Sequence, residues 1–416
     1  MLVHWIWLAH RPGLSQRMKY RLLEQLSTAE AVYAGTRETY ARVEELSAEG
    51  LAALEDKDLS EAWMVLGQCA DGNIQILTMA DSAYPRRLKH IPDPPVLLYY
   101  KGTLPDFEKQ PIIGVVGTRK ASSYGLATAK QFGYQIACCG GIVVSGLAKG
   151  IDAMAMEGAV LAGAPTVGVL GCGVGRVYPA CNRELFRRTE RYGCILSEYP
   201  PGTPPLKRNF PLRNRIIAGL SDGVLVVEAP DPSGALITAD FALNQGRDVF
   251  AVPGNINNLC CAGSNALLGD GARAVTSGWE VIREYQGRYP DTIRMSNAIL
   301  PEQPIFREPE KPAAKPAPGS KKQASERKPD KKVVDKEQNP PYIDLNEIMA
   351  RLSEDEKAIV NALRRGVRSV DDVIAETGFS TGRMLSNMTV LELKNILVRL
   401  PGKRIELRRE NPRKRS

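Results

Sequence analysis

The chain has 416 residues, a formal net charge of +8 and a hydrophobic content of 43%. This length exceeds what one hydrophobic core normally serves, so we expect two or three ordered domains. No stretch offers the roughly 20 apolar residues that a membrane-spanning helix needs, and the first residues, Met1 to Trp5, lack the basic start and cleavage site of a secretion signal. The sequence therefore predicts a cytoplasmic protein without a membrane partner.

The eight cysteines predict reduced thiols. Cys138 and Cys139 are adjacent, as are Cys260 and Cys261, and no CxxC spacing occurs. Disulfide frameworks and zinc sites need other spacings, so we expect small buried hydrophobic side chains here, with no metal and no cofactor.

The positive charge is concentrated at one end of the chain. Residues 301–416 hold 25 Lys and Arg against 18 Asp and Glu, which leaves about +1 for residues 1–300. A nucleic-acid site in the main body must therefore be a focused patch, because the overall field is too weak to steer a polyanion.

Composition divides the chain into five segments. Residues 301–341 are rich in proline and charge with few large apolar side chains, which predicts a disordered linker. Residues 1–75 carry apolar side chains at helical spacing and predict a small helical domain. Residues 80–290 predict an α/β domain, 345–407 a compact C-terminal domain and 408–416 a basic tail.

The α/β domain alternates short apolar runs with helical patterns of 10–15 residues, which predicts a doubly wound, mainly parallel, Rossmann-like sheet. The expected strands are Ile112–Val116, Ile142–Val144, Thr166–Leu170, Ile195–Leu196, Val224–Val227 and Val249–Val252.

The C-terminal domain is expected to be a winged helix. Ser353 and Ser369 each precede an acidic residue by three positions, which is typical of a helix start. A third helix is expected over 380–394, and 396–400 with 405–407 would form a β-hairpin. A winged helix binds either DNA or another protein, and both remain open.

Ligands of open parallel sheets bind at the carboxyl ends of the strands, so the loops after the strands are candidate sites. Gly117-Thr118-Arg119 follows the first expected strand, with Ser122 and Ser123 placed to cap the next helix; free amides and a guanidinium there suit a phosphate. The next loops hold Ser145, Gly146 and Lys149, and then Gly171, Gly173 and Gly175. Their spacing fits neither a dinucleotide fingerprint nor a P-loop.

The segment from Lys207 to Arg215 is the strongest candidate for nucleic-acid binding. It holds four cations, no acid and a phenylalanine, Phe210. Cations neutralise a backbone and an aromatic ring stacks on a base, which together are typical of single-strand binding, although a solvated helix face is the alternative. Glu198 and Glu228 repel phosphate, so we expect them to hold Arg213 or Arg215 in place.

The order of these motifs resembles the DprA/Smf family, DNA-processing protein A. The resemblance rests on GTR, SGLAKGID, GVLGCGVGRVYP, the segment from SEYPPG to VVEA, SGALITADFALNQGRDVFAVPG and GSNALLGDGA, over about residues 80–285. The flanks are similar to the family's SAM-like N-terminal domain and its winged-helix domain.

The resemblance implies a homodimer that binds and protects single-stranded DNA without strong sequence preference and loads RecA recombinase onto it in natural transformation. Arg119 and Lys207 would each hold a phosphate, Phe210 would stack on a base, and Arg213 and Arg215 would complete the wall of the groove. The predicted single-stranded DNA site comprises Gly117, Thr118, Arg119, Ser145, Gly146, Lys149, Gly171, Lys207, Asn209, Phe210, Arg213, Asn214, Arg215, Ser233, Gly234, Gly254 and Asn255.

Two alternatives stay open. A nucleoside monophosphate phosphoribohydrolase would share this fold, but residues 232–240 depart from its PGGxGTxxE loop, and His4, His10 and His90, the only histidines, lie outside the expected loops. We therefore expect no catalytic residues. A winged-helix regulator would place Arg383 in a major groove, but it is the only cation in its stretch of helix.

Overall fold

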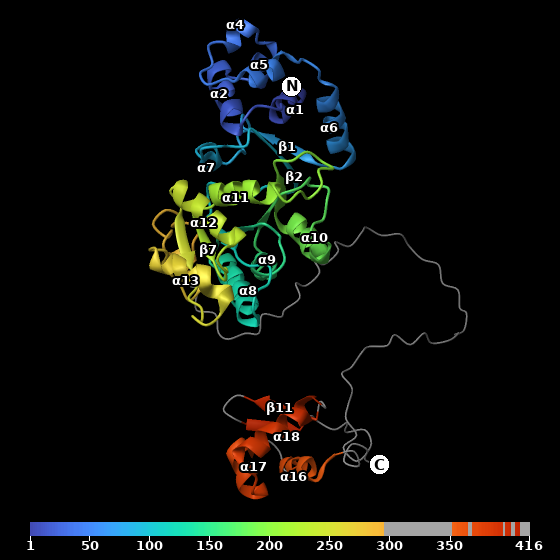
Figure 1. Ribbon diagram of the computed structural model, residues 1–416, viewed down its shortest axis with the longest axis vertical. Helices are drawn as coiled ribbons and strands as arrows, with labels where there is room; N and C mark the ends of the chain where they lie inside the picture. Colours follow the sequence, from blue (N-terminus) through green and yellow to red (C-terminus); the bar gives the residue numbers. More distant parts are fainter. Residues whose placement is uncertain (295–351, 365–367, 394–395, 401–403, 408–416) are drawn as a thin grey trace, which may run out of the picture. The chain divides into compact units, whose positions relative to one another are not determined.

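A computed structural model of the protein describes residues 1–294, 352–364, 368–393, 396–400 and 404–407 (Figure 1). They belong to two units, one before and one after the segment 295–351. The expected linker, 301–341, and the basic tail, 408–416, lie outside the described residues. Among these residues no helix combines the length and apolar character needed to cross a bilayer.

Six helices form the start of the first unit: α1 (Leu2–His10), α2 (Gln16–Leu26), α3 (Ala29–Ala34), α4 (Arg37–Tyr40), α5 (Ala48–Glu55) and α6 (Ser60–Asp71). Hydroxyl side chains accept from backbone amides at the starts of α2 to α5, which satisfies donors that a helix start leaves unpaired. Trp7, Leu8, Leu22 and Leu54 are fully buried between the helices. The predicted helical start of the chain is present; its SAM-like character stays a prediction.

The rest of the first unit is built on a nine-stranded sheet in the order β1-β2-β6-β5-β4-β3-β7-β8-β9. Its strands are β1 (Gln75–Thr78), β2 (Leu97–Gly102), β3 (Ile112–Val116), β4 (Ile142–Ser145), β5 (Thr166–Leu170), β6 (Cys194–Ser197), β7 (Gly223–Val226), β8 (Asp248–Ala251) and β9 (Arg273–Ala274). Strand β2 is antiparallel to both of its neighbours, β1 and β6. All other neighbouring strands of the sheet are parallel to each other. The six expected strands are confirmed, and β1, β2 and β9 add to them.

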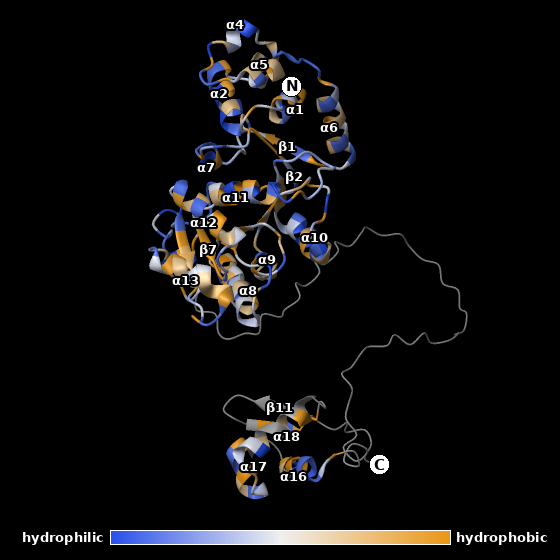
Figure 2. Ribbon diagram, in the orientation of Figure 1, coloured by the Kyte–Doolittle hydropathy of each residue, from blue (hydrophilic) through white to orange (hydrophobic). Residues whose placement is uncertain are grey.

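Helices cover both faces of the sheet, as the doubly wound prediction requires. Helix α9 (Ile151–Leu161) and helix α11 (Asn209–Leu220) both pack on β3, β4 and β5 but do not pack on each other, so they lie on opposite faces. Helices α8 (Ser123–Cys138), α10 (Arg183–Tyr192) and α14 (Gly278–Arg283) accompany α9, and α7 (Arg86–Lys89) and α12 (Gly234–Asn244) accompany α11. The remaining helices of this unit are η1 (Ala180–Asn182), η2 (Leu259–Cys261) and α13 (Ala262–Gly269). Figure 2 shows hydrophobic colour on the strands around β7, as a sheet buried on both faces requires.

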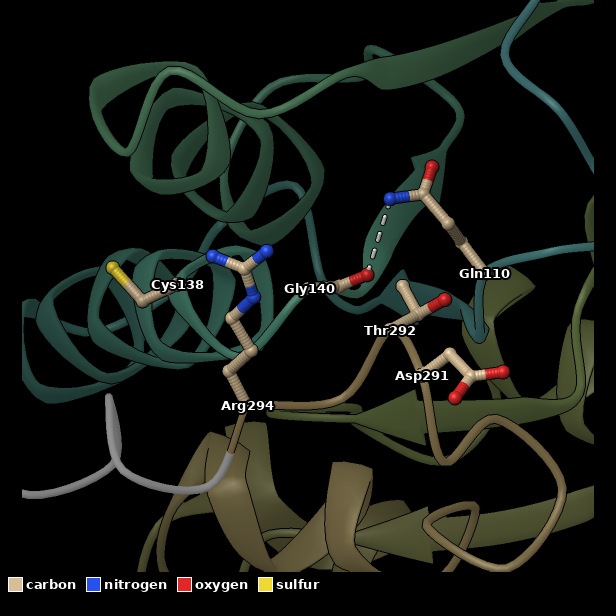
Figure 3. A pocket seen from close by; sticks show the side chains of 6 residues that line it. All are labelled: Gln110, Cys138, Gly140, Asp291, Thr292 and Arg294. Atoms are coloured by element: carbon tan, nitrogen blue, oxygen red, sulfur yellow. Dashed lines mark hydrogen bonds between the residues drawn. The ribbon is translucent and has the colours of Figure 1, made fainter.

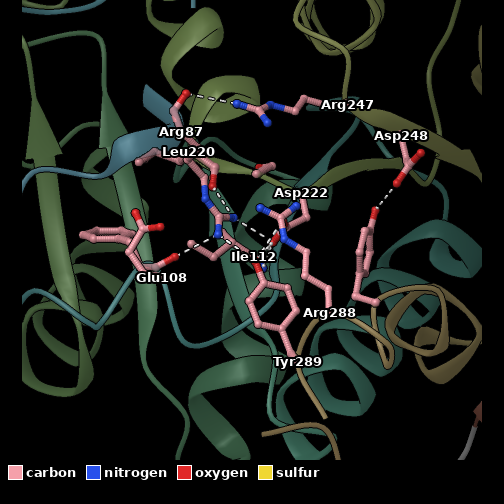
Figure 4. A network of polar contacts seen from close by, with 12 residues as sticks. Arg87, Glu108, Ile112, Leu220, Asp222, Arg247, Asp248, Arg288 and Tyr289 are labelled. Atoms are coloured by element: carbon pink, nitrogen blue, oxygen red, sulfur yellow. Dashed lines mark hydrogen bonds and ion pairs between the residues drawn. The ribbon is translucent and has the colours of Figure 1, made fainter. Parts of the chain in front are cut away.

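A buried polar network joins distant segments at the amino edge of the sheet (Figure 4). The Asp222 carboxylate, at the start of β7, accepts from Arg87 Nη1 at 2.6 Å and from the Ile112 amide at 2.9 Å. Tyr289 and Arg288 also reach it, at 3.0 and 2.9 Å. Burial alone would lower the pKa of Arg87, but the Asp222 carboxylate raises it. This ion pair therefore fixes α7 and the segment after α14 against the sheet.

The second unit is a small α/β module. Its elements are α16 (Glu354–Leu363), β10 (Arg368–Ser369), α17 (Val370–Thr377), α18 (Thr381–Leu393), β11 (Leu397–Leu400) and β12 (Arg404–Leu407). Ser353 and Glu356 form the expected capping box, and Ser369 caps α17. The strands pair in the order β10-β12-β11. Three helices with a hairpin are the predicted winged-helix arrangement.

Candidate nucleic-acid interface

The loops at the carboxyl edge of the sheet are joined by backbone hydrogen bonds. The amide of Thr118, after β3, donates to the carbonyl of Glu228, after β7, at 2.7 Å. The amide of Ile151, after β4, donates to the Thr118 carbonyl at 3.3 Å. Gly150 has a φ of +82° and lies against the Thr118 carbonyl, so a side chain there would be both strained and obstructed. Three loops thus form one continuous surface at this edge.

A cation and an aromatic ring from distant segments meet on this surface. The Arg119 side chain is exposed, and its Cζ lies 5.4 Å from the centroid of the Phe210 ring. Phe210 is in the first turn of α11, and Cζ of Arg213 lies 6.0 Å from the same centroid. A guanidinium within about 6 Å of a ring is attracted to its π face. The structure therefore places the predicted phosphate ligand and the predicted stacking ring side by side.

Arg213 is inside the protein rather than on the surface. Only 4% of the residue is exposed, and its Nη1 donates to the carbonyls of Gly146, at 3.1 Å, and Val169. Its Nε donates to Asn214 Oδ1 at 3.2 Å. Burial lowers the pKa of Arg213 to about 10, and burial raises the pKa of the nearby Asp152 carboxyl. Arg213 stays a cation at neutral pH and joins α11 to strand β5 and to the loop after β4.

Arg215 is buried in an ion pair. Its Nη2 donates to Glu198 Oε1 at 2.5 Å, and its Nε donates to the carbonyl of Asp93 at 3.0 Å. Burial alone would lower the pKa of Arg215, but the Glu198 carboxylate raises it. The prediction that Glu198 holds an arginine is therefore confirmed for Arg215.

These contacts correct one expectation. Arg213 and Arg215 were expected to form the wall of a groove, but nearly every residue of α11 after Leu212 is buried. Their guanidinium groups are directed to internal acceptors. They position α11 and its first turn, in which Phe210 is partly buried, rather than presenting charge to a ligand.

The role expected for Glu228 also differs. Its carboxylate is fully buried and accepts from the amide of Ser122 at 2.9 Å and from the Ser122 hydroxyl at 2.5 Å, while Cys261 Sγ lies 3.9 Å away. It therefore holds the start of α8 rather than Arg213 or Arg215. The Ser122 hydroxyl in turn accepts from the Gly125 amide at 3.1 Å. These donors at the start of α8 are therefore engaged within the protein, whereas the Arg119 side chain of the same loop is exposed.

Two further predicted cations, Lys149 and Lys207, are exposed. Lys149 is in the loop after β4, and Lys207 precedes α11. Lys120 and Arg208, which are outside the predicted list of site residues, follow Arg119 and Lys207 in the chain and are exposed. The predicted cations Arg119, Lys149 and Lys207 are thus all exposed, while the focused positive patch stays a prediction.

Several predicted residues are structural partners of these loops. Ser145 Oγ donates to the Val115 carbonyl at 2.6 Å, and Asn209 Nδ2 donates to the Gly171 carbonyl at 3.1 Å. Both polar side chains are buried, so they brace the loops.

The loops after β7 and β8 complete the edge. Ser233 caps α12, and the Gly234 carbonyl accepts from Asn214 Nδ2 at 3.1 Å. The Gly254 amide donates to Asn265 Oδ1 at 3.0 Å, and Asn255 is exposed. Gly117, between β3 and Arg119, lies against Ile151 and the Glu228 carbonyl.

Sequence reasoning missed Tyr178, which comes from the segment between β5 and η1. Its ring centroid is 5.6 Å from that of Phe210, and 39% of the residue is exposed. The sequence signal that could have found it is an aromatic residue followed by proline at the end of a glycine-rich loop.

A hollow of about 300 Å³ lies away from this surface, near the amino ends of β3 and β4 (Figure 3). Figure 3 shows Gln110 Nε2 donating to the Gly140 carbonyl, with Asp291, Thr292 and Arg294 around them. It contains none of the predicted site residues.

A family model described as DNA recombination-mediator protein A matches residues 75–286, half of the chain. The chain belongs to the DprA/Smf family. A second model, the DprA winged helix domain, matches residues 347–403 and agrees with the expected C-terminal winged helix.

DprA proteins of two bacteria illustrate the likeness. The DNA processing protein DprA of Bacillus subtilis is 40% identical over 224 residues, which cover 54% of this chain and 75% of the relative. The DprA protein of Streptococcus pneumoniae is 44% identical over 211 residues, which cover 50% of this chain and 73% of the relative. The crystal structure of S. pneumoniae DprA superposes on this protein with a TM-score of 0.61. The matched region has 35% sequence identity and covers 68% of this chain and 98% of the S. pneumoniae chain.

Proposed function

We propose that this DprA/Smf protein binds single-stranded DNA across the carboxyl edge of its sheet. The observation that carries the proposal is the pairing of Arg119 with Phe210, 5.4 Å from guanidinium carbon to ring centroid, beside the exposed Lys207. Cations neutralise phosphates, and an accessible ring adds roughly 1–3 kcal/mol for each base that stacks on it.

The aromatic ring favours a single strand over a duplex. A base in a duplex is already stacked between its neighbours, so a ring on a protein surface reaches its face only after the base leaves the stack. Arg119 and Lys207 alone would serve both kinds of DNA, because they neutralise phosphates. Phe210 is therefore the residue that should make the protein bind single-stranded DNA more tightly than a duplex.

We also propose the cellular role that the family resemblance implies. The chain would act in the cytoplasm as a homodimer that protects incoming single strands and loads RecA recombinase onto them in natural transformation. Two measurements test this role: the molar mass by light scattering, and RecA assembly on a strand coated with single-strand-binding protein. A monomeric mass, or RecA assembly that the protein does not accelerate, would contradict it.

We further propose that the site binds without catalysing a reaction. Residues 232–240 depart from the loop that phosphoribohydrolases use, since Gly234 begins α12 directly after its cap, Ser233, and no second glycine accompanies it. Release of free base from a nucleoside monophosphate, followed by chromatography, would overturn this part of the proposal.

The binding proposal is tested by fluorescence anisotropy with a labelled oligothymidine and with a matched duplex. The variants are Arg119→Ala, Lys207→Ala and Phe210→Ala, with Lys109→Ala as control, because Lys109 is an exposed cation near the amino end of β3. Wild type should prefer the single strand. Arg119→Ala and Lys207→Ala should each reduce the logarithmic salt slope by about 0.7, because each variant neutralises one phosphate fewer.

Phe210→Ala should weaken single-strand binding without changing that slope, because it neutralises no phosphate. Equal affinities for wild type and the three variants would move DNA binding away from this edge. A preference for the duplex would overturn the proposal.

A further inference from the structure

Tyr178 and Phe210 form an aromatic pair from segments far apart in the chain. Their centroids are 5.6 Å apart and their planes meet at 38°. This separation is within the range of rings in direct contact. A base inserted between two parallel rings needs a separation of about 7 Å, twice the usual contact distance of about 3.5 Å. The pair therefore presents outer faces to a ligand rather than a slot.

The two rings differ in how far they are covered. Phe210 is partly buried, with Gly171 against its edge and the guanidinium carbons of Arg119 and Arg213 at 5.4 and 6.0 Å from its centroid. Tyr178 is 39% exposed, and within the described part of the chain its hydroxyl has no hydrogen-bond partner. Tyr178 thus offers the more accessible ring and a free polar group at its tip.

Phe210 is the common neighbour of a cation and of the second ring. Its centroid is 5.4 Å from Arg119 Cζ and 5.6 Å from the centroid of Tyr178, and Lys207 is exposed just before α11. A strand whose phosphate meets Arg119 would carry its neighbouring bases past both rings.

We propose that Tyr178 is a second base-stacking residue, which takes the base next to the one at Phe210. This inference rests on the proposed single-strand function. It extends the site from one aromatic contact to two and onto the segment between β5 and η1. A surface of stacked aromatic side chains with a basic border suits bases of any identity, because each base has a π face.

The test compares Tyr178→Ala, Tyr178→Leu and Tyr178→Phe with wild type in the same anisotropy assay. Trp63→Ala is the control, because Trp63 is a 54% exposed aromatic on α6. Loss of one stacked base corresponds to a roughly 5- to 150-fold weaker affinity. We expect this loss for Ala, a similar loss for Leu, near wild-type binding for Phe, and an unchanged salt slope throughout.

The Leu variant separates stacking from packing. It keeps an apolar side chain against Phe210 but has no π face, so wild-type affinity in Tyr178→Leu would overturn the inference. Photocrosslinking provides a second readout: an oligothymidine with 5-iodouracil substitutions should crosslink to Tyr178 in the wild-type protein. Crosslinks only to other residues would also overturn it.

The outcomes keep the two proposals apart. If Arg119→Ala and Phe210→Ala lose affinity while Tyr178→Ala binds within twofold of wild type, the Tyr178 inference fails and the proposed function stands. If none of these variants changes single-strand binding, both fail.

Discussion

Gly171 lies against the ring of Phe210, so that a Cβ at Gly171 would come within 2.9 Å of Phe210 Cδ1. The same glycine accepts from Asn209 Nδ2, the residue before the ring, through its carbonyl. The loop after β5 therefore sets the position of the first turn of α11 by close contact.

We expect Gly171→Ala to displace the Phe210 ring and weaken single-strand binding by about 1 kcal/mol, the lower end of one stacking contact. Gly175→Ala is the matched control in the same loop, because a Cβ there would meet its nearest neighbour, Ile74 Cδ1, only at 4.0 Å. Anisotropy titrations with oligothymidine measure both. Equal affinities for the two variants would show that Gly171 does not position the ring for DNA.

Asp222 is expected to matter for stability and not for binding. It is buried and holds Arg87, the Ile112 amide and Tyr289. Removing it leaves the buried Arg87 cation without its counter-charge, which costs about 3–5 kcal/mol of unfolding free energy. We expect this loss for Asp222→Ala in chemical denaturation.

Asp248→Ala is the control for this experiment. Asp248 is exposed and accepts one hydrogen bond, from Tyr285 at 2.8 Å, so its removal should cost about 1 kcal/mol. The folded Asp222→Ala protein should bind single strands like wild type, because Asp222 is at the amino edge of the sheet. Reduced affinity in fully folded protein would contradict the separation of the two edges.

Much of the sheet is predictable because buried parallel strands are continuous apolar runs. Ile112–Val116 and Thr166–Leu170 match their predicted bounds. Strand β1, Gln75–Thr78, has only two apolar residues, between Gln75 and Thr78, and it pairs with β2 across an intervening helix, so no continuous apolar run indicates it. Its antiparallel register depends on long-range contacts that a single sequence does not display.

The site was predictable in its chemistry and less so in its exposure. Arg119, Lys207 and Phe210 were selected because their residue types suit DNA, and the structure brings Arg119 and Phe210 together. Four cations in nine residues suggested an exposed face, yet Arg213 and Arg215 point into the protein. Their acceptors, the Val169 carbonyl and the Glu198 carboxylate, come from β5 and the end of β6, so the sequence around α11 could not reveal them.

His10 should make stability depend on pH. Burial, followed by the nearby Lys19 and Arg11, lowers its pKa from 6.5 to about 4, and its Nε2 is 3.1 Å from the Tyr99 hydroxyl. Below pH 6.5 the unfolded chain takes a proton on this histidine that the folded chain does not take until about pH 4. The free energy of unfolding therefore falls as the pH drops through this window, by about 2 kcal/mol between pH 7 and 5.

His10→Gln keeps a hydrogen-bonding partner for Tyr99 and removes the titration. Chemical denaturation of both proteins at several pH values gives the difference in unfolding free energy. This difference should change by about 2 kcal/mol between pH 7 and 5, since the carboxyl groups common to both proteins cancel. A difference that is constant across this range would show that His10 titrates normally.

Arg383 should contribute little to DNA binding although it is on the helix that winged-helix regulators place in the major groove. Its Nε and Nη2 donate to the two carboxylate oxygens of Asp355, at 2.8 and 2.7 Å, and its Cζ is 4.8 Å from the ring centroid of Phe379. A guanidinium paired in this way presents few donors to a base edge. We expect Arg383→Ala to change duplex affinity less than twofold, whereas removal of a base-reading arginine weakens binding roughly tenfold.

Anisotropy titrations of the full chain with duplex DNA measure the effect of Arg383→Ala. The comparison is Arg119→Ala titrated with single strands, which shows the size of the change when a direct DNA ligand is removed. A tenfold loss in Arg383→Ala would return the winged helix to the role of a duplex reader, with Asp355 released when DNA binds.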